Sequence, residues 1–134
     1  MQDGQTRKLT RSGDSSAAKT FFDRYRAFLV SVAGTTAGNE YPLERDRVSL
    51  GRGPGVDLAF DDSTMSREHA AFELVEGGIR VRDMASTNGV LLNDSATLVA
   101  VLKNGDRIQI GEHVFQYVVE ERERTPRTYV LPDS

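Results

Sequence analysis

The stretch from Gly51 to Gly89 contains three polar groups, each placed where a short apolar run ends or begins: Gly51-Arg52, Ser66-Arg67-Glu68-His69-Ala70 and Asp83-Met84-Ala85-Ser86-Thr87-Asn88-Gly89. Short apolar runs joined by segments rich in Gly, Ser, Asn and Asp are typical of an all-β sandwich or barrel. The loops of such a scaffold are a common place for a binding site. The Arg, Ser, Thr and Asn side chains and the Gly amides of these loops can all donate hydrogen bonds to an anion, phosphate in particular.

The same pattern continues on both sides of this stretch. Apolar runs that suit strands cover residues 28–32, 40–43, 47–50, 56–60, 70–75, 78–83, 90–92, 98–102, 107–110 and 113–119. Pro42 predicts an edge position for its strand, because proline cannot donate a hydrogen bond to a neighbouring strand. Ile79 and Val81 alternate with Arg80 and Arg82, which predicts one buried and one solvated face. We therefore expect an all-β sandwich of about ten to eleven short strands.

Polar and charged segments flank this pattern. Residues 1–20 contain few large apolar side chains, and residues 120–134 are charged and contain proline. Both compositions are typical of disordered tails. We therefore expect one domain over residues 21–119 between an N-terminal tail (1–20) and a C-terminal tail (120–134). The segment from Thr20 to Tyr25 suits a helical turn or a strand, since periodicity over so few residues cannot decide.

Composition narrows the class of protein. The formal net charge is −3, which gives no reason to expect nucleic acid or a membrane surface as a partner. The absence of Cys excludes a disulfide framework and thiolate metal sites, and two His residues make a multi-His metal site improbable. The same absence fits a reducing compartment. We expect a cytoplasmic monomer that holds no metal and no cofactor.

The ordered set of polar groups resembles the forkhead-associated (FHA) domain. The resemblance rests on six segments: Gly51-Arg52, Ser66-Arg67-Glu68-His69-Ala70, Val81-Arg82-Asp83, Ser86-Thr87-Asn88-Gly89, Asn104-Gly105-Asp106 and Ile110-Gly111. Each segment alone is a weak signal, but their order and spacing over residues 28–119 are specific. FHA domains are β-sandwiches that bind phosphothreonine peptides through their loops. The resemblance implies an adaptor in Ser/Thr kinase signalling, with phosphothreonine-containing proteins as partners and a Ser/Thr protein kinase as a further candidate.

The resemblance also implies a role for each polar loop residue. Arg52 and Ser66 would grip the phosphate, with Thr87 beside them. Arg67 and Asn88 would hold the main chain of the peptide near the phosphothreonine. The chemistry agrees, because a guanidinium matches phosphate geometry and keeps its charge, and an amide can both donate and accept as a neighbouring strand does.

Four further residues would support these loops. His69 would be buried and would bridge the loops from beneath. Gly51 and Gly89 would allow backbone conformations or close approaches that a Cβ would obstruct. Asp83 would use its carboxylate to hold backbone amides of the loop that follows it.

Two other functions compete with this hypothesis. Ser66, His69 and either Asp61 or Asp83 supply the residue types of a hydrolytic triad. Because Ser66 and His69 are only three residues apart at a strand start and no Gly-x-Ser-x-Gly elbow is present, we expect no enzyme. An FHA-type interaction scaffold that binds partners without phosphate is the second alternative.

The tails carry candidate phosphorylation sites. Thr6, Thr10 and Thr20 lie in or beside the N-terminal tail, Thr125 precedes a proline in the C-terminal tail, and basic residues lie near most of them. A phosphate adds about −1.5 to −2 of charge and three strong acceptors. We therefore predict that a phosphothreonine of a tail can occupy this chain's own binding site.

Overall fold

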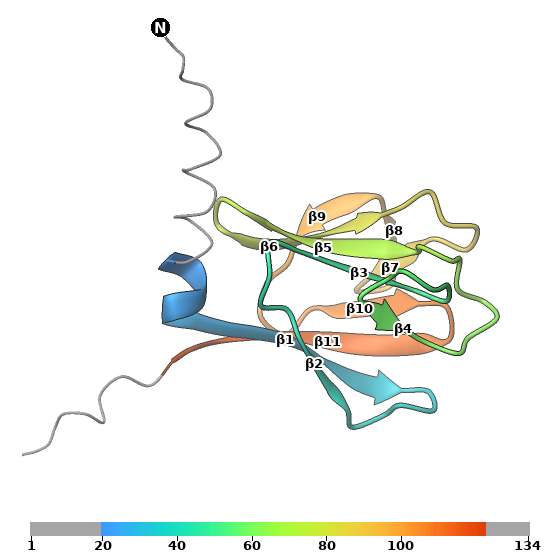
Figure 1. Cartoon of the computed structure of the whole chain (residues 1–134), viewed down its shortest axis with the longest axis horizontal. Helices are drawn as coiled ribbons and strands as arrows, with labels where there is room; N and C mark the ends of the chain where they lie inside the picture. Colours follow the sequence, from blue (N-terminus) through green and yellow to red (C-terminus); the bar gives the residue numbers. More distant parts are fainter. Residues whose placement is uncertain (1–19, 123–134) are drawn as a thin grey trace, which may run out of the picture.

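Two β-sheets packed face to face form the part of the chain that the computed structural model describes, residues 20–122 (Figure 1). The strands are, in chain order, β1 (Tyr25–Ala33), β2 (Glu40–Pro42), β3 (Arg47–Gly51), β4 (Leu58–Ala59), β5 (Ala70–Val75), β6 (Gly78–Asp83), β7 (Val90–Leu92), β8 (Ser95–Thr97), β9 (Val99–Val101), β10 (Arg107–Ile110) and β11 (His113–Glu121). The expected all-β sandwich of about ten to eleven strands is therefore confirmed.

The sheets differ in size. The six-stranded sheet has the order β2-β1-β11-β10-β7-β8, and the five-stranded sheet has the order β4-β3-β5-β6-β9. The neighbouring strands run antiparallel, except that β4 pairs with β3 in parallel. β2 lies at an edge of its sheet, as Pro42 predicts.

The core lies between the two sheets and follows the alternation of each strand. In β6, Ile79 and Val81 are about 1% exposed, whereas Arg80 and Arg82 lie on the opposite face. Large side chains from both sheets fill the interior, including Leu29, Phe72, Phe115, Ile108 and Tyr117. Burial of each large apolar side chain contributes roughly 1.5–3 kcal/mol, so this core holds the loops at the sandwich ends in place.

Both ends of the sandwich differ in detail from the sequence-based expectation, and the structure settles whether residues 20–24 are helical or extended. Residues 20–24 form a helical turn, and the strand begins at Tyr25 rather than at residue 28. β11 continues through Glu120 and Glu121, because these carboxylates pair across the ladder with Arg26 (2.6 Å) and Arg24 (3.4 Å). The charged residues Glu120 and Glu121 therefore belong to the paired end of β11 rather than to the C-terminal tail.

β8 was not expected as a strand. It follows β7 through a tight turn in which Asn93 and Asp94 have φ angles of 49° and 72°. Two successive positive φ values are the mark of a type I′ hairpin turn, which Asn and Asp tolerate better than most residues. β8 contains no large apolar residue, so hydrophobic alternation gave no signal for it.

The two ends of the described chain lie side by side. The Arg122 amide donates to the Arg24 carbonyl oxygen at 2.8 Å, and the Arg122 Nε donates to the Phe22 carbonyl oxygen at 2.7 Å. Figure 1 shows both ends at one end of the sandwich, opposite the β3–β4, β4–β5 and β6–β7 loops. The tail regions 1–19 and 123–134 lie outside the described residues. Among residues 20–122, no helix is long and apolar enough to cross a membrane.

Candidate functional site

The loops β3–β4, β4–β5 and β6–β7 surround an open cleft of about 470 Å³ at one end of the sandwich. Its lining consists of Arg52, Ser63, Thr64, Met65, Ser66, Arg67, Glu68, Thr87 and Asn88. All five residues to which the resemblance assigns phosphate or peptide contacts therefore line one cleft, although they come from three loops.

Arg52 follows the last residue of β3 and lies at the mouth of the cleft. Its backbone amide donates to the Ser66 carbonyl oxygen at 3.0 Å, and its Nε donates to the Met65 carbonyl oxygen at 3.0 Å. The Nε bond orients the guanidinium and leaves its two terminal amino groups for a ligand. The arrangement suits a two-pronged contact with phosphate oxygens.

Ser66 is oriented by the neighbouring loop. Its Oγ accepts a hydrogen bond from the Thr87 backbone amide at 2.9 Å. Because the oxygen acts as acceptor in this bond, the hydroxyl hydrogen stays available for a phosphate oxygen. Ser66 and the exposed Thr87 therefore lie side by side in the lining of the cleft, and each carries a hydroxyl group.

His69 is fully buried beneath the loops. Its Nδ1 accepts from the Ser66 amide at 3.0 Å, which places the ring hydrogen on Nε2, and Nε2 donates to the Gly89 carbonyl oxygen at 2.8 Å. The imidazole thus joins the β4–β5 loop to the β6–β7 loop. Both ring nitrogens are occupied by backbone groups, so His69 is not placed to act as a general base for Ser66.

The two supporting glycines act in different ways. A Cβ on Gly51 would overlap the Arg67 carbonyl oxygen and lie 2.9 Å from the Ser66 carbonyl oxygen, so only glycine allows this close approach of two loops. Gly89 has a φ of +82° with open space around it. Gly89 therefore serves the backbone conformation of its loop rather than a close contact.

Arg67 and Asn88 both line the cleft. The Arg67 side chain is exposed, and its stem packs over Gly53, where a Cβ would lie 3.0 Å from the Arg67 Cβ. The Asn88 Nδ2 donates to the Thr64 carbonyl oxygen at 2.8 Å. This bond links two loops and leaves the Asn88 Oδ1 as an acceptor for a peptide amide.

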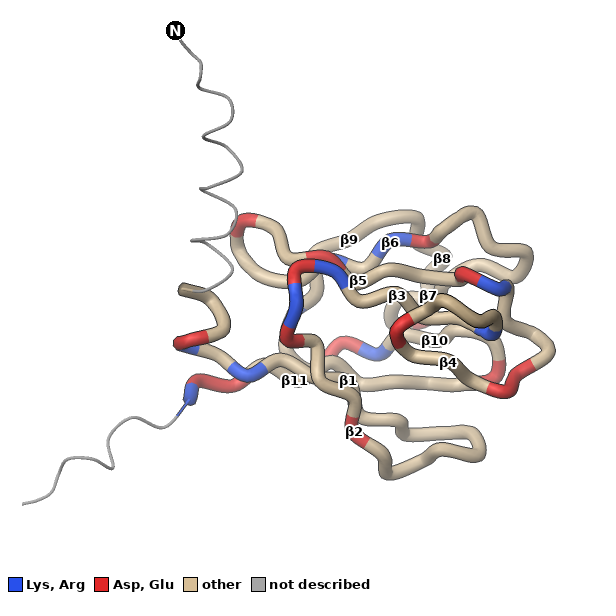
Figure 2. Tube along the Cα trace, in the orientation of Figure 1, with Lys and Arg blue, Asp and Glu red and all other residues tan. Residues whose placement is uncertain are grey.

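The cleft is locally cationic. Arg52 and Arg67 have no carboxylate within salt-bridge distance among residues 20–122, whereas most other arginines of this region do. Glu68 lines the cleft, but its carboxylate binds the Arg47 Nη2 at 3.0 Å. Figure 2 shows acidic and basic positions interspersed along the chain, so the positive field at the cleft comes from these local groups.

Asp83 holds the β6–β7 loop, as expected. Its Oδ1 accepts from the Ser86 amide at 3.2 Å and from the Ser86 hydroxyl at 2.5 Å. The Ser86 Oγ in turn accepts from the Gly89 amide at 2.9 Å. Because these bonds fix Ser86 and Gly89, they also fix Thr87 and Asn88 between them.

Asp62 is a supporting residue that sequence analysis missed. It is 6% exposed, and it accepts from the Thr64 amide at 2.8 Å, the Glu112 amide at 2.9 Å and the His113 Nδ1 at 2.8 Å. Burial, the strongest influence, acts to raise its pKa, but the hydrogen bonds from Thr64, Glu112 and His113 outweigh burial and hold the pKa well below its ordinary value. Asp62 thus ties the β4–β5 loop to the β10–β11 turn.

The only sequence signal for Asp62 was local. An Asp two residues before Thr64 fits a turn in which the carboxylate caps the following amides. Its other partner, His113, lies 51 positions away. No group of three or more His, Cys, Asp or Glu that could hold a metal ion occurs in the described part of the chain.

Comparison with known proteins places the chain in a family and identifies its fold. The profile of a family described as the inner membrane component of T3SS, cytoplasmic domain, matches residues 31–121. A structure from a structural and functional analysis of phosphothreonine-dependent FHA domain interactions superposes with a TM-score of 0.64 at 25% identity, over 69% of this chain and 95% of that chain. The structure of an FHA domain from Arabidopsis thaliana superposes with a TM-score of 0.64 at 28% identity, over 75% of this chain and 88% of that chain. The chain belongs to the family whose profile it matches, and its fold is that of the forkhead-associated domains.

Two curated relatives are regulators by name. The glycogen accumulation regulator GarA of Mycolicibacterium smegmatis is 43% identical over 86 residues, which are 64% of this chain and 54% of GarA. The oxoglutarate dehydrogenase inhibitor of Corynebacterium efficiens is 41% identical over 86 residues, which are 64% of this chain and 61% of the inhibitor. The FHA chain thus spans little more than half the length of these relatives.

Proposed function

We propose that this FHA protein binds phosphothreonine-containing proteins and acts as a phosphorylation-dependent regulator in Ser/Thr kinase signalling. One observation carries the proposal: Arg52, Ser66, Arg67, Thr87 and Asn88 line a single cleft whose two guanidinium groups have no carboxylate partner among residues 20–122. The names of the two relatives, a regulator and an inhibitor, support a regulatory role rather than catalysis.

Different residues of the cleft would contact the phosphate and the peptide main chain. The terminal amino groups of Arg52 and the hydroxyls of Ser66 and Thr87 would take the phosphate oxygens. Arg67 and the Asn88 Oδ1 would take the peptide main chain. Charge-assisted hydrogen bonds contribute roughly 1.5–3 kcal/mol each. Three or four of them, less the cost of ordering a peptide, leave about 8 kcal/mol, which corresponds to micromolar affinity.

The direct test is calorimetric titration of the full chain with a phosphothreonine peptide and with the same peptide bearing plain threonine. We expect about micromolar affinity for the first and no measurable heat for the second. Phosphoserine and glutamate peptides complete the series and separate recognition of phosphothreonine from recognition of any anion. Equal affinity for the phosphorylated and plain peptides would favour the phosphate-independent scaffold instead.

The identity of the partner is best sought with a phosphothreonine peptide library on the purified protein. The residues that would read neighbouring side chains lie in the β3–β4 and β4–β5 loops around the cleft. A phosphorylated segment of a Ser/Thr protein kinase belongs in the same screen as a candidate partner. Selection of a defined sequence around the phosphothreonine would identify the kind of protein that this chain regulates.

A further inference from the structure

The edge strand β9 and the residue before it carry several exposed apolar side chains. Among residues 20–122, the large hydrophobic residues that are exposed are Leu98 at 76%, Val99 at 47% and Val101 at 50%. All three lie in one short segment at the edge of the five-stranded sheet, beyond β6. Proteins usually protect such an edge with charged residues or proline, and β9 has neither.

The backbone of β9 is open on its outer side. The Leu102 amide donates to the Ile79 carbonyl oxygen and the Asp83 amide donates to the Leu98 carbonyl oxygen, both at 2.8 Å. In this antiparallel register, residues 98, 100 and 102 therefore direct their backbone groups toward β6. Val99 and Val101 direct theirs to the other side, where no strand of the described residues pairs with them. Two donors and two acceptors at strand spacing form a template for an added strand.

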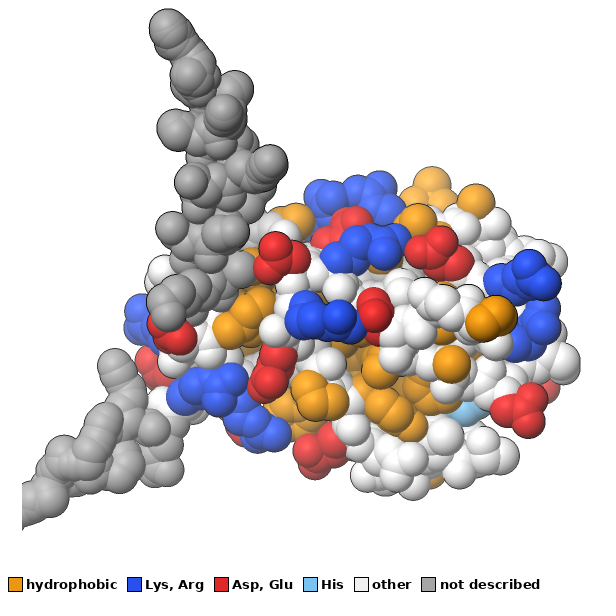
Figure 3. Space-filling model, in the orientation of Figure 1, with side chains coloured by type: hydrophobic (Ala, Val, Ile, Leu, Met, Phe, Trp, Pro, Cys, Tyr) orange, Lys and Arg blue, Asp and Glu red, His pale blue; other side chains and the backbone are white. Residues whose placement is uncertain are grey.

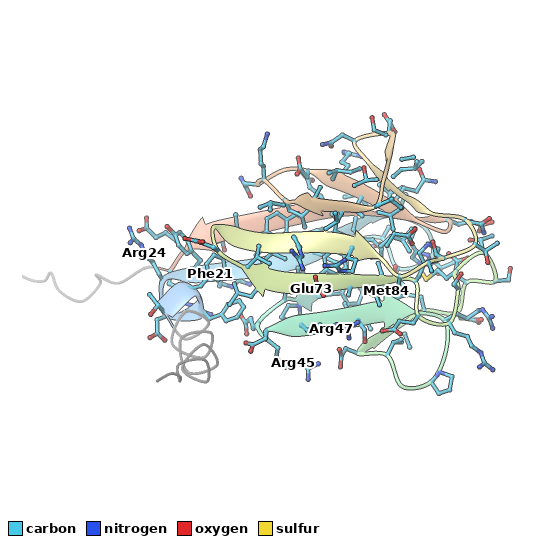
Figure 4. The ribbon with its side chains drawn as sticks, turned by 90° about the horizontal axis from the view of Figure 1, so that it is seen from above. Phe21, Arg24, Arg45, Arg47, Glu73 and Met84 are labelled. Carbon is cyan, nitrogen blue, oxygen red and sulfur yellow. The ribbon has the colours of Figure 1, made fainter. Side chains whose placement is uncertain are left out.

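The face beside this edge is basic. Val101 lies opposite Arg80 and Val99 lies opposite Arg82. Both arginines donate through Nε to the Glu73 Oε1, at 2.8 Å and 3.2 Å, and the Arg47 Nε lies 3.8 Å from the Glu73 Oε2. Figure 4 shows Arg47 and Glu73 on this outer face, and Figure 3 shows charged and apolar side chains side by side over it. Three guanidinium groups thus share one carboxylate.

Two of these arginines remain able to bind a further carboxylate. The Arg80 and Arg82 side chains are 33% and 40% exposed, and their terminal amino groups have no hydrogen-bond partner among residues 20–122. Burial acts against ionisation of Glu73, but the hydrogen bonds from Arg80 and Arg82 outweigh it and lower the pKa of Glu73. Glu73 therefore stays ionised and holds the two guanidinium groups in place beside β9.

We propose that the β9 edge is a docking site for an extended segment of a partner protein, which adds to the sheet as a strand. Its aliphatic residues would pack beside Val99 and Val101, and an acidic residue would reach Arg80 or Arg82. The edge shares no residue with the cleft, so a partner can use both, and this inference does not rest on the proposed function.

A second copy of the chain fits this edge less well. Pairing β9 with β9 of another copy would join two strands of 3 residues each, far short of the roughly 1,200–2,000 Å² of a stable interface. It would also bring the Arg80 and Arg82 pairs of both copies onto one face, with like charges. An acidic segment of a different protein meets neither obstacle, and its flanks can continue along the surface.

The test uses the full chain, labelled for NMR, and a short synthetic peptide in which Val and Glu alternate. Two control peptides carry Lys in place of Glu, or N-methyl groups on alternate amides. We expect the acidic peptide to shift the amides of β9 and β6 and to slow hydrogen exchange at Val99 and Val101, and both controls to bind at least about tenfold more weakly. Binding should persist in an Arg52→Ala background.

A pair of variants separates the backbone from the side chain. Val101→Pro removes an outward N–H that the fold does not use, and we expect about tenfold weaker binding of the acidic peptide. Val101→Thr keeps that N–H and should bind within about threefold of the parent. Equal binding of the Lys peptide and the Glu peptide, shifts confined to the cleft loops, concentration-dependent dimerisation through β9, or no shift at about millimolar peptide would each overturn the proposal.

Discussion

Arg52 combines exposure with a fixed orientation, because its Nε bond to the Met65 carbonyl oxygen holds the guanidinium while its terminal amino groups stay open. We expect Arg52→Ala to weaken phosphopeptide binding by roughly a hundredfold or more, since at least two charge-assisted hydrogen bonds are lost. The free energy of unfolding should change by less than about 0.5 kcal/mol. Arg52→Lys should restore only part of the affinity, because an ammonium cannot form the two-pronged contact.

Calorimetry with one phosphothreonine peptide measures the affinities of the parent, Arg52→Ala and Arg52→Lys. Thermal melting checks that all three proteins are folded. Arg107 provides a matched control, since it is exposed like Arg52 but does not line the cleft. Arg107→Ala should leave affinity unchanged. Parental affinity in Arg52→Ala would show that the phosphate site has been placed wrongly.

His69 and Ser66 are joined by a hydrogen bond but differ in role, since His69 supports the loops and Ser66 is expected to contact the ligand. We expect His69→Ala to lower the free energy of unfolding by about 1–3 kcal/mol, because it leaves the Ser66 amide and the partly buried Gly89 carbonyl without their partner. Ser66→Ala removes a hydroxyl that accepts from an exposed amide which water can satisfy, so it should cost affinity with little change in melting temperature. Equal melting temperatures for the two variants would contradict this distinction.

At the scale of elements, the β4–β5 loop depends on Asp62. The pKa of this carboxyl is lowered in the folded state, so its contribution to stability is present above the unfolded pKa of about 3.9 and is lost as the pH falls through the folded value. Asp62→Asn cannot ionise and lacks the contribution at every pH. We expect the variant to be about 1–3 kcal/mol less stable at pH 6, with the difference shrinking toward pH 2.

Urea unfolding of both proteins between pH 6 and pH 2 measures this difference. Asp61→Asn is the matched control, because Asp61 is exposed and adjacent in sequence. The free energy of unfolding of Asp61→Asn should stay close to that of the parent from pH 6 to pH 2. A gap between the parent and Asp62→Asn that is the same at every pH would exclude the ionised carboxylate as its cause.

Most strands could be predicted from the sequence because their side chains alternate between a buried and a solvated face. β6 shows this, with Ile79 and Val81 buried between arginines. β8 could not be found in this way, since Ser95, Ala96 and Thr97 bury no large side chain and the strand is positioned by its hairpin turn. The Asn93-Asp94 pair was a usable turn signal.

The convergence of the cleft residues was predictable only through the resemblance, because three separate loops meet there. The supports with distant partners were not predictable. Asp62 meets His113 across 51 positions, and Glu73 collects Arg47, Arg80 and Arg82 from two neighbouring strands. Pairing of this kind depends on sheet order, and sheet order depends on the whole core. The arginines of β6, expected as a solvated face, are thus ion-paired and partly covered.

At the scale of the whole molecule, the position of the chain ends limits which tail threonine can reach the cleft. β1 has 9 residues and runs from the end of the sandwich where residues 20 and 122 lie to the end with the loops, a distance of about 30 Å. An extended chain spans at most about 3.3–3.6 Å per residue. Ten residues separate Thr10 from Thr20, so Thr10 reaches about 33–36 Å and Thr6 reaches further. Thr125 lies three residues beyond Arg122 and reaches only about 10 Å.

We therefore expect phosphorylation at Thr6 or Thr10, and not at Thr125, to block the cleft. A tethered phosphothreonine has an effective concentration of about a millimolar, so it should weaken an external micromolar peptide by roughly a hundredfold or more. Semisynthetic chains phosphorylated at one position each allow the comparison by calorimetry. Unchanged external affinity after phosphorylation of Thr6 and Thr10, or an equal loss after phosphorylation of Thr125, would refute self-binding at this site.

The adjacent ends also decide how the molecule responds to mechanical load. β1 and β11 are the first and last strands, and they pair antiparallel with Tyr25 opposite Glu121. A force that pulls the two tails apart acts across this ladder, so it opens the hydrogen bonds one after another, like a zipper. A force between the cleft and either tail acts along the strands and must break many bonds together. Tension between two partners held by the tails would therefore unfold this sandwich at a much lower force than tension between a tail and a ligand in the cleft.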